Sequence, residues 1–435
     1  MLVLKHSPTQ AQAVREYIDS LQNKSSPNYH KWLTPEEFGA RYGPSDEDLK
    51  TVTDWLASHG FTVNRVAKAR NSIEFSGTAG SVQEAFHTTI HSYVMNGEQH
   101  FAIATDPEIP AALAAVVAGV TKLNNFNPKR DVMPGKPGKW NTEKKAGGEF
   151  TGIIDNDPYL FLVPADVAAI YNTPNAQLNP AYTGPTYDGT GVTVGIIGDA
   201  NFTMQDVANY RAFFLNDTST AHLPNVIIDG NDPGLNNDSI EALLDNEVLG
   251  GVAPGATINF YTAANTEVQG GLFLAISRAL DDNAVSVLNL SFGYCELLMG
   301  SSENQLFYQY WEQAAAQGIS VAVSTGDTGS ANCDAQGQST SYNGLAVNGF
   351  TSTPYNVAVG GTDFAVLASN YPASFNQYMN TSTGSVAPYY GSATGYIPET
   401  PWNNTTISNT TIDLNQSFPK EVLGGGGGGG TGGKS

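Results

Sequence analysis

Two carboxylates four residues apart are the strongest candidates for chemistry in this sequence. Glu241 and Asp245 stand at the ends of Glu-Ala-Leu-Leu-Asp, and this spacing places both on one face of a helix. Their charges repel unless they share a proton, and sharing raises one pKa so that the pair can act as acid and base at low pH. The competing interpretation is a solvated helix face. The Gly/Pro turn at 250–256 and the apolar strand expected after it favour a functional pair.

A third acid, Asp327, lies in Ser-Thr-Gly-Asp-Thr-Gly, directly after an apolar run at 319–324 that is expected to form a strand. Open α/β proteins place their sites at the carboxyl ends of such strands, and the flanking glycines let backbone and substrate approach closely. Histidine is a poorer candidate base. His222 is the only histidine after His100, and it stands in an apparent loop before a strand. We therefore interpret His222 as a surface residue and the carboxylates as the chemical groups.

The elements that must position these acids alternate along the second half of the chain. Short β-branched apolar runs predict strands at 192–198, 225–228, 257–261, 285–290 and 319–324, with helices at 204–214, 239–249, 267–280 and 302–317 between them. Continuous apolar strands that alternate with helices are typical of a parallel sheet covered on both faces. The expected fold class of this half is therefore α/β.

The first 126 residues have a different pattern. Helices are expected at 10–21, 46–59 and 81–87, and strands at 61–66, 72–75, 88–94 and 100–104. Ser45 can cap the second helix and Gly60 stands where it should stop. This order predicts a small α+β unit. Residues 127–150 hold six Lys or Arg, three Pro and four Gly, which indicates an exposed linker open to proteolysis. The domains are therefore expected at 1–126, 127–158 (linker with a processing site) and 159–435.

Charge divides the chain in the same way. Residues 1–150 hold 16 basic and 16 acidic residues, whereas residues 151–435 hold 4 basic and 25 acidic residues, which accounts for the net charge of −21. Such an acidic chain argues against nucleic acid as a partner. No run of 18 apolar residues occurs, so no membrane partner is expected. Hydrophobic residues make up 40% of the 435 residues, enough for a sizeable core.

Cysteine is sparse. Cys295 and Cys333 are the only two, and each follows a predicted strand. Strand ends of one parallel sheet converge on one edge, so a single disulfide is plausible in an oxidising compartment, with two free thiols as the alternative. Two cysteines and no clustered histidine make a zinc site a poor interpretation.

SSPNYHKWLTPEEFGARYG at 25–43 and YLFLVPADVAAIYN at 159–172 are two longer motifs of this sequence. Together with EALLD and STGDTG they resemble one known family, the sedolisins or serine-carboxyl peptidases. The first motif is similar to the hallmark of their prodomain, and the second to the start of the mature peptidase. EALLD resembles the catalytic helix, VLNLSFG at 287–293 the strand that flanks the substrate, and STGDTG the oxyanion segment. PYNVAVGGT at 354–362 and ETPWN at 399–403 are further shared landmarks.

The resemblance implies a subtilisin-like catalytic domain after a small ferredoxin-like prodomain, and an acid-active endopeptidase that cleaves proteins and binds its own prodomain. Glu241 would be the general base, Asp245 would hold and tune it, and Asp327 would donate a hydrogen bond to the oxyanion. Ser291, Phe292 and Gly293 would bind the substrate, and Cys295 would pair with Cys333. A carboxylic acid donates a hydrogen bond only when protonated, which explains the implied acid optimum.

The sequence departs from the family pattern in one respect. The family nucleophile lies in Gly-Thr-Ser, followed by a calcium site, and this sequence contains no Gly-Thr-Ser. We therefore expect a zymogen of a secreted enzyme whose C-terminal part is cut short, with the nucleophile and the calcium ligands outside the chain. No signal peptide is visible at the N-terminus. The alternatives are a pseudo-peptidase that binds peptides or inhibits related enzymes, and a polar extracellular structural module.

The uneven charge distribution also predicts how the attraction between the two parts of the chain depends on pH. The linker and N-terminal part hold 16 of the 20 bases, and the acidic part holds 25 carboxyl groups that lose charge as the pH falls toward 4. We expect attraction between the two parts to weaken in acid and to help release the N-terminal part.

Overall fold

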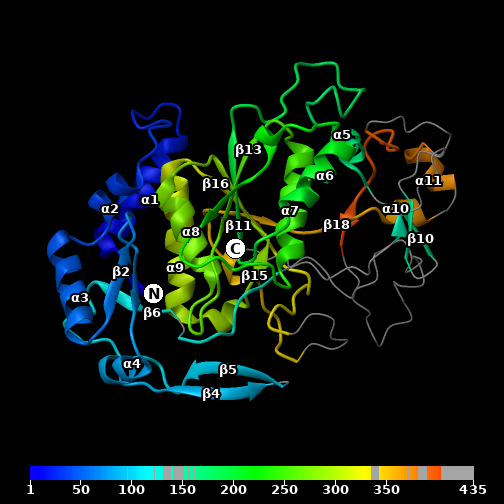
Figure 1. Cartoon of the computed structure of the whole chain (residues 1–435). Helices are drawn as coiled ribbons and strands as arrows, with labels where there is room; N and C mark the ends of the chain where they lie inside the picture. Colours follow the sequence, from blue (N-terminus) through cyan, green and yellow to red (C-terminus); the bar gives the residue numbers. More distant parts are fainter. Residues whose placement is uncertain are drawn as a thin grey trace.

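The computed structural model describes residues 1–95, 97–121, 123–130, 139–140, 151–154, 157–160, 162–334, 342–369, 373–380 and 389–402. These residues form two units that lie side by side (Figure 1). The N-terminal unit is drawn in blue and cyan, and the large unit runs from green to orange. Most of the expected linker and residues 403–435, which include the end of the ETPWN motif, lie outside the described residues. No helix within the described residues is long and apolar enough to cross a bilayer.

The N-terminal unit has a four-stranded antiparallel sheet in the order β2-β3-β1-β6. Together with the helices that connect its strands, this order is ferredoxin-like, as expected. A separate hairpin, β4 and β5, extends below the sheet (Figure 1). The strands are β1 (Leu2–Leu4), β2 (Thr62–Val66), β3 (Ser72–Ser76), β4 (Ile90–Met95), β5 (Glu98–Ile103) and β6 (Val117–Val120). The sequence pattern missed β1 and β6, which are only three and four residues long.

Four helices complete this unit: α1 (Pro8–Gln22), α2 (Pro35–Tyr42), α3 (Asp46–Ser58) and α4 (Ala79–Phe86). Ser45 caps α3 as expected, because its side chain accepts from the backbone of Asp48 while Asp48 reaches back to the backbone of Ser45. The expectations omitted α2, although Thr34 and Glu37 form the same kind of capping box. Polar capping thus fixes where these helices begin.

The large unit has a six-stranded parallel sheet in the order β12-β13-β11-β14-β16-β17. All five expected strands are present, and β17 adds an edge strand that the pattern did not predict. The strands are β11 (Thr193–Gly198), β12 (Asn225–Ile228), β13 (Thr257–Thr262), β14 (Val287–Leu290), β16 (Ser320–Ser324) and β17 (Val357–Val359). The expected α/β class is therefore confirmed.

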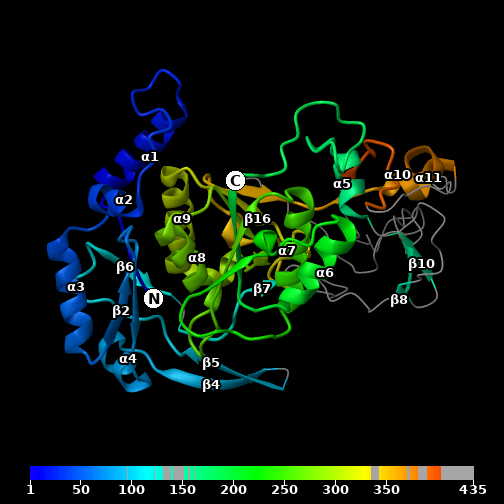
Figure 2. The ribbon, with the colours of Figure 1, turned by 45° about the horizontal axis from the view of Figure 1, so that its top comes forward.

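Helices cover both faces of this sheet. One face carries α8 (Gly271–Asp282) and α9 (Glu296–Gln317), and the other carries α6 (Met204–Phe214) and α7 (Ser239–Val252) (Figure 2). α9 begins six residues earlier than expected and kinks at Gly300, whose φ is 70°. Smaller elements are α5 (Pro164–Ile170), α10 (Ala365–Ser369), α11 (Ala373–Tyr378), β18 (Thr362–Asp363) and β19 (Thr400–Pro401). β7 (Lys129–Arg130) pairs with β15 (Phe292–Gly293), and a three-stranded sheet contains β8 (Lys139–Trp140), β9 (Thr151–Ile154) and β10 (Asp157–Leu160).

The N-terminal unit packs on the face of the large unit that α8 and α9 cover. Met1 and Val3 belong to the same buried apolar cluster as Leu272 and Trp311. Polar groups also cross this boundary: His6 Nε2 lies 3.2 Å from a carboxylate oxygen of Glu312. The boundary is therefore a mixed apolar and charged interface, which we call the unit interface.

Candidate active site

The segments that carry the expected acids lie at the carboxyl edge of the parallel sheet. β14 ends at Leu290 and its neighbour β16 ends at Ser324, with Leu290 opposite Val323 in the ladder. Ser291 follows the first strand, and Asp327 stands three residues after the second. α7 starts at Ser239 after the chain leaves β12, so Glu241 lies in its first turn. Parallel topology thus gathers residues that are far apart in sequence.

Asp245 is held by two neutral donors. Ser291 Oγ donates to Oδ1 at 2.8 Å, and Asn289 Nδ2 donates to Oδ2 at 3.0 Å. Asn289 Nδ2 also lies 3.1 Å from Ser291 Oγ, so the three side chains form one cluster. Burial raises the pKa of Asp245 to about 7, although both hydrogen bonds act in the opposite direction. Asp245 is therefore a fixed carboxyl group that takes up a proton in mild acid.

Glu241 lies one helical turn before Asp245 and is only 3% exposed. Its place in the first turn of α7 puts it near the positive end of the helix dipole, which stabilises a negative charge, whereas its burial acts in the opposite direction. The two acids of the motif therefore stand one turn apart on one face of α7.

Asp327 occupies a tight loop beyond β16. Thr325 N donates to Val359 O at 2.9 Å, which ties the start of the loop to β17. Gly326 has a φ of 93°, a conformation that favours glycine and turns the chain just before Asp327. Burial raises the pKa of Asp327 to about 6. In acid below that value, Asp327 is a protonated donor at the edge of the sheet.

The strand expected to flank the substrate already pairs with another piece of chain. Phe292 lies opposite Arg130 and Gly293 opposite Lys129 in an antiparallel ladder between β15 and β7. The ring of Phe292 is buried in the core and Ser291 Oγ is bonded to Asp245. β15 therefore presents its backbone edge, the part of the chain that binds an extended peptide by strand addition.

The structure contains the expected disulfide and separates His222 from the acids. Cys295 and Cys333 are joined, with their Cα atoms 4.9 Å apart. His222 is placed far from the acids, since it precedes β12 and so lies at the amino edge of the sheet, where Nδ1 is 2.8 Å from Asp217. No three His, Cys, Asp or Glu side chains cluster as a metal site in the described residues.

Family models match most of the chain. The model described as "Pro-kumamolisin, activation domain" matches residues 2–126, and the model of the "Subtilase family" matches residues 189–422. The second match spans more than half of the chain. A parallel sheet with helices on both faces and carboxyl groups at its carboxyl edge agrees with this class, the subtilisin-like α/β proteins. The chain belongs to the subtilase family.

Several curated proteins show which subtilases the chain is similar to. Xanthomonalisin from Xanthomonas sp. (strain T-22) is 27% identical over 420 residues, which cover 87% of this chain and 47% of the relative. Sedolisin from Pseudomonas sp. (strain 101) is 26% identical, covering 84% and 59%, and kumamolisin from Bacillus sp. (strain MN-32) is 27% identical, covering 79% and 58%. The chain is thus similar to the sedolisins, and the resemblance seen in its motifs is confirmed. It spans about half the length of these relatives.

One solved structure is also similar, "Pseudomonas sedolisin (serine-carboxyl proteinase) complexed with two molecules of pseudo-iodotyrostatin". Its identity to this chain is 24%, its TM-score is 0.43, and the match covers 63% of each chain.

Sequence reasoning missed Asn289 at this site. Its amide is central to the cluster around Asp245, yet the sequence pattern treated 287–293 as a single strand motif. A usable signal was present, because an Asn inside a run of Val and Leu in a strand between two others must find a buried partner.

Proposed function

We propose that the chain is the zymogen form of an acid-active serine-carboxyl endopeptidase, with residues 1–126 as its prodomain. The observation that carries this proposal is the pair of perturbed carboxyl groups at one sheet edge, Asp245 with a pKa of about 7 and Asp327 with a pKa of about 6. Both are neutral near pH 4. The proposal assigns the ionised form to Glu241, which lies in the first turn of α7, where the helix dipole stabilises a negative charge.

In the proposed reaction Glu241 acts as the general base for a serine nucleophile. A protonated Asp245 can donate its proton to Glu241 in a hydrogen bond, while Ser291 and Asn289 keep Asp245 in place. A protonated Asp327 donates to the oxyanion of the tetrahedral intermediate, a contribution worth about 3 kcal/mol in comparable sites. The chain contains no Gly-Thr-Ser, so the proposal assigns the carboxyl groups and leaves the nucleophile unassigned.

The strand pair β7–β15 supports an intramolecular role for the linker. Lys129 and Arg130 lie antiparallel to Phe292 and Gly293, the arrangement proposed for a substrate. In the zymogen this segment would occupy the place of a substrate, so its removal would open the site. Substrates would be proteins or peptides bound in extended form. The proposed setting is an acidic extracellular environment.

The test uses two forms of the protein: the 435-residue chain, and a form continued through the reading frame that follows codon 435. Peptide cleavage is assayed from pH 3 to 8. The proposal expects activity near pH 4 in the continued form, its loss in Glu241→Gln, and its loss in Asp327→Asn. Activity that Glu241→Gln leaves intact would overturn the assigned roles.

A second candidate is a peptide-binding or inhibitory pseudo-peptidase, supported by the backbone edge of β15, which already pairs with an extended segment, β7. It would bind peptides along β15 with no cleavage and no covalent labelling by a serine-directed reagent. Peptide binding by both forms of the protein, with neither labelling nor cleavage, would select this candidate over the first.

A further inference from the structure

A fully buried amide joins the two sides of the candidate site. Asn348 is 0% exposed, and its Nδ2 donates to Phe292 O at 3.1 Å and to Ser324 O at 2.9 Å. The first carbonyl belongs to β15, and the second is the last residue of β16, three residues before Asp327. One side chain therefore connects the strand and the loop that carry the proposed chemistry.

The other end of the same amide is equally engaged. Asn348 Oδ1 accepts from Tyr294 N at 3.2 Å and from Phe350 N at 3.0 Å. Two donated and two accepted hydrogen bonds use the whole capacity of an Asn side chain. A flipped amide would face both N–H groups with its own N–H bonds, so only one orientation fits. A satisfied buried network of this kind is rigid.

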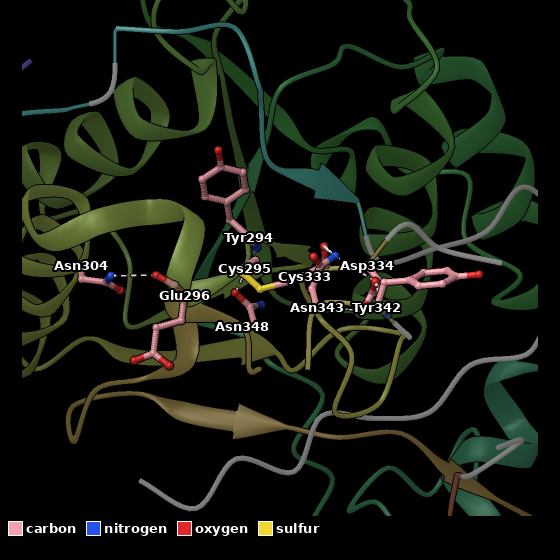
Figure 3. The surroundings of a disulfide bond; sticks show 9 residues. All are labelled: Tyr294, Cys295, Glu296, Asn304, Cys333, Asp334, Tyr342, Asn343 and Asn348. Carbon is pink, nitrogen blue, oxygen red and sulfur yellow. Dashed lines mark hydrogen bonds between the residues drawn. A yellow bond between two sulfur atoms is a disulfide. The ribbon is translucent and has the colours of Figure 1, made fainter. Parts of the chain in front are cut away.

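A covalent link joins the same two segments. Cys295 follows β15, and Cys333 follows Asp327 by six residues; their disulfide lies beside Asn348 in Figure 3. Cys295 also forms a backbone bridge with Asn348. On the far side of the loop, Ala346 N donates to Ser330 O at 2.9 Å. The disulfide and residues 346–348 thus hold the loop from both ends.

We propose that Asn348 is a positioning residue that fixes the separation between β15 and the Asp327 loop, with the Cys295–Cys333 disulfide as its reinforcement. The inference rests on the proposed function only for its consequence in catalysis, since those two segments would bind the peptide and its oxyanion. Asn348 would fix the separation of the two segments in the folded chain whether or not the chain cleaves peptides.

Placement distinguishes this role from general support of the core. Both acceptors of the Asn348 amide are backbone carbonyls at the carboxyl edge, one on each side of the candidate site. An oxyanion donor must stand within about 3 Å of the developing charge, so a small change in this separation would matter for catalysis. Asn348 touches no reacting group and acts through the backbone of Phe292 and Ser324.

The test substitutes Asn348→Asp in the full chain. The new carboxylate keeps the shape and the two accepted hydrogen bonds, but it turns negative oxygen toward two carbonyl oxygens that need donors. The matched control is Asn71→Asp, because Asn71 is also buried and its Nδ2 donates to the side-chain oxygen of Gln313, at 2.9 Å in the unit interface. Asn348→Ser, which keeps one donor, is the second variant in case Asn348→Asp does not fold.

Two measurements test whether the separation between β15 and the Asp327 loop is fixed, and neither requires enzymatic activity. Amide hydrogen exchange at 292–294 and 326–328 should accelerate about tenfold or more in Asn348→Asp, relative to Asn71→Asp at equal global stability. The titration of Asp327, followed by carboxyl NMR with Asp327→Asn for assignment, should move toward its ordinary range as water enters. Reduction of the disulfide in the unsubstituted chain should accelerate the same amides by a smaller factor.

The proposal is overturned if these amides and the Asp327 titration stay as they are, or if Asn71→Asp changes them equally. It is supported if only the Asn348 variants and reduction change them. The outcome is separate from that of the proposed function, which the Glu241→Gln activity assay decides. A loosened site in a chain that never cleaves peptides would uphold the positioning role and refute the peptidase.

Discussion

The unit interface and the carboxyl edge of the sheet both bury acids, but they stabilise them in different ways. At the interface, acids of the large unit face bases of the N-terminal unit: Arg65 lies 3.1 Å from Asp229 and 3.9 Å from Asp281. At the carboxyl edge, Asp245 accepts hydrogen bonds from the neutral side chains of Ser291 and Asn289. Ion pairs hold two surfaces together, whereas neutral donors hold a carboxyl group in place and still let it take up a proton.

The largest expected effect concerns the pH dependence of stability at the edge. The pKa of Asp245 is raised by burial to about 7, so the folded state binds its proton more tightly than the unfolded state. Its stabilising contribution is therefore complete below about pH 4 and is lost as the pH rises through 7. Asp245→Asn should remove about 3 kcal/mol of the difference in unfolding free energy between pH 4 and pH 7. Chemical denaturation at both pH values measures it.

Asp217→Asn is the control with the opposite sign. Burial alone would raise the pKa of Asp217, but hydrogen bonds from Ser219 N, Arg211 and His222 outweigh it and hold the pKa below its usual range. Its contribution is present at neutral pH and disappears in acid. Equal pH profiles for the two Asn variants would contradict the comparison between held and ion-paired acids.

The next effect concerns the interface. Arg65→Ala removes the cation that pairs with Asp229 and Asp281 across the interface, and we expect a loss of about 2 kcal/mol in unfolding free energy at pH 7. The loss should shrink at pH 5, because burial raises the pKa of Asp281 to about 6, against the effect of Arg65, and a protonated Asp281 needs no counter-charge. Lys50→Ala, which breaks an exposed pair with Asp54, should cost less than about 0.5 kcal/mol.

Asp281 acts against the expectation that acid releases the N-terminal unit. Its raised pKa means that the folded, associated form takes up the proton more readily, so this residue by itself favours association as the pH falls. Acid release would have to come from other pairs across the interface. A pH-independent effect of Arg65→Ala would contradict this reading of Asp281.

A smaller effect tests whether the units pack closely. Gly318 has a φ of 78°, and a Cβ there would lie 2.5 Å from the indole of Trp32. Gly191 has a φ of 83° with nothing within 4 Å, so Gly191→Ala measures backbone strain alone, about 1 kcal/mol. Gly318→Ala should cost about 1–2 kcal/mol more than Gly191→Ala in thermal or chemical unfolding. Equal costs would show that Trp32 does not pack on Gly318 in solution.

The smallest effect is expected at the histidine. His222 is partly exposed and bonded to Asp217 at the edge opposite the acids. His222→Gln should change the unfolding free energy by less than about 1 kcal/mol and leave the titration of Asp327 where it is. A shift of that titration would connect His222 to the site and reverse our interpretation of it.

The sequence by itself predicted the division into two units and five of the six strands of the large sheet. Apolar runs such as 192–198 must be buried, and their alternation with helices admits few arrangements other than a parallel sheet. It also determined the candidate acids, since the i and i+4 spacing of Glu241 and Asp245 follows from the geometry of any helix. Short elements escaped it, because β1 and β6 are held by strand pairing rather than by local pattern.

Only the tertiary structure decided what surrounds those acids. Asn289 lies 44 residues from Asp245 along the chain, and Asn348 lies 56 residues from Phe292. No local sequence pattern links either Asn to its partner. The raised pKa values of Asp245 and Asp327 likewise come from burial by segments that fold over them. Spacing along one helix sets which side chains can meet, but desolvation and hydrogen bonding depend on contacts between distant segments, which exist only once the sheet has formed.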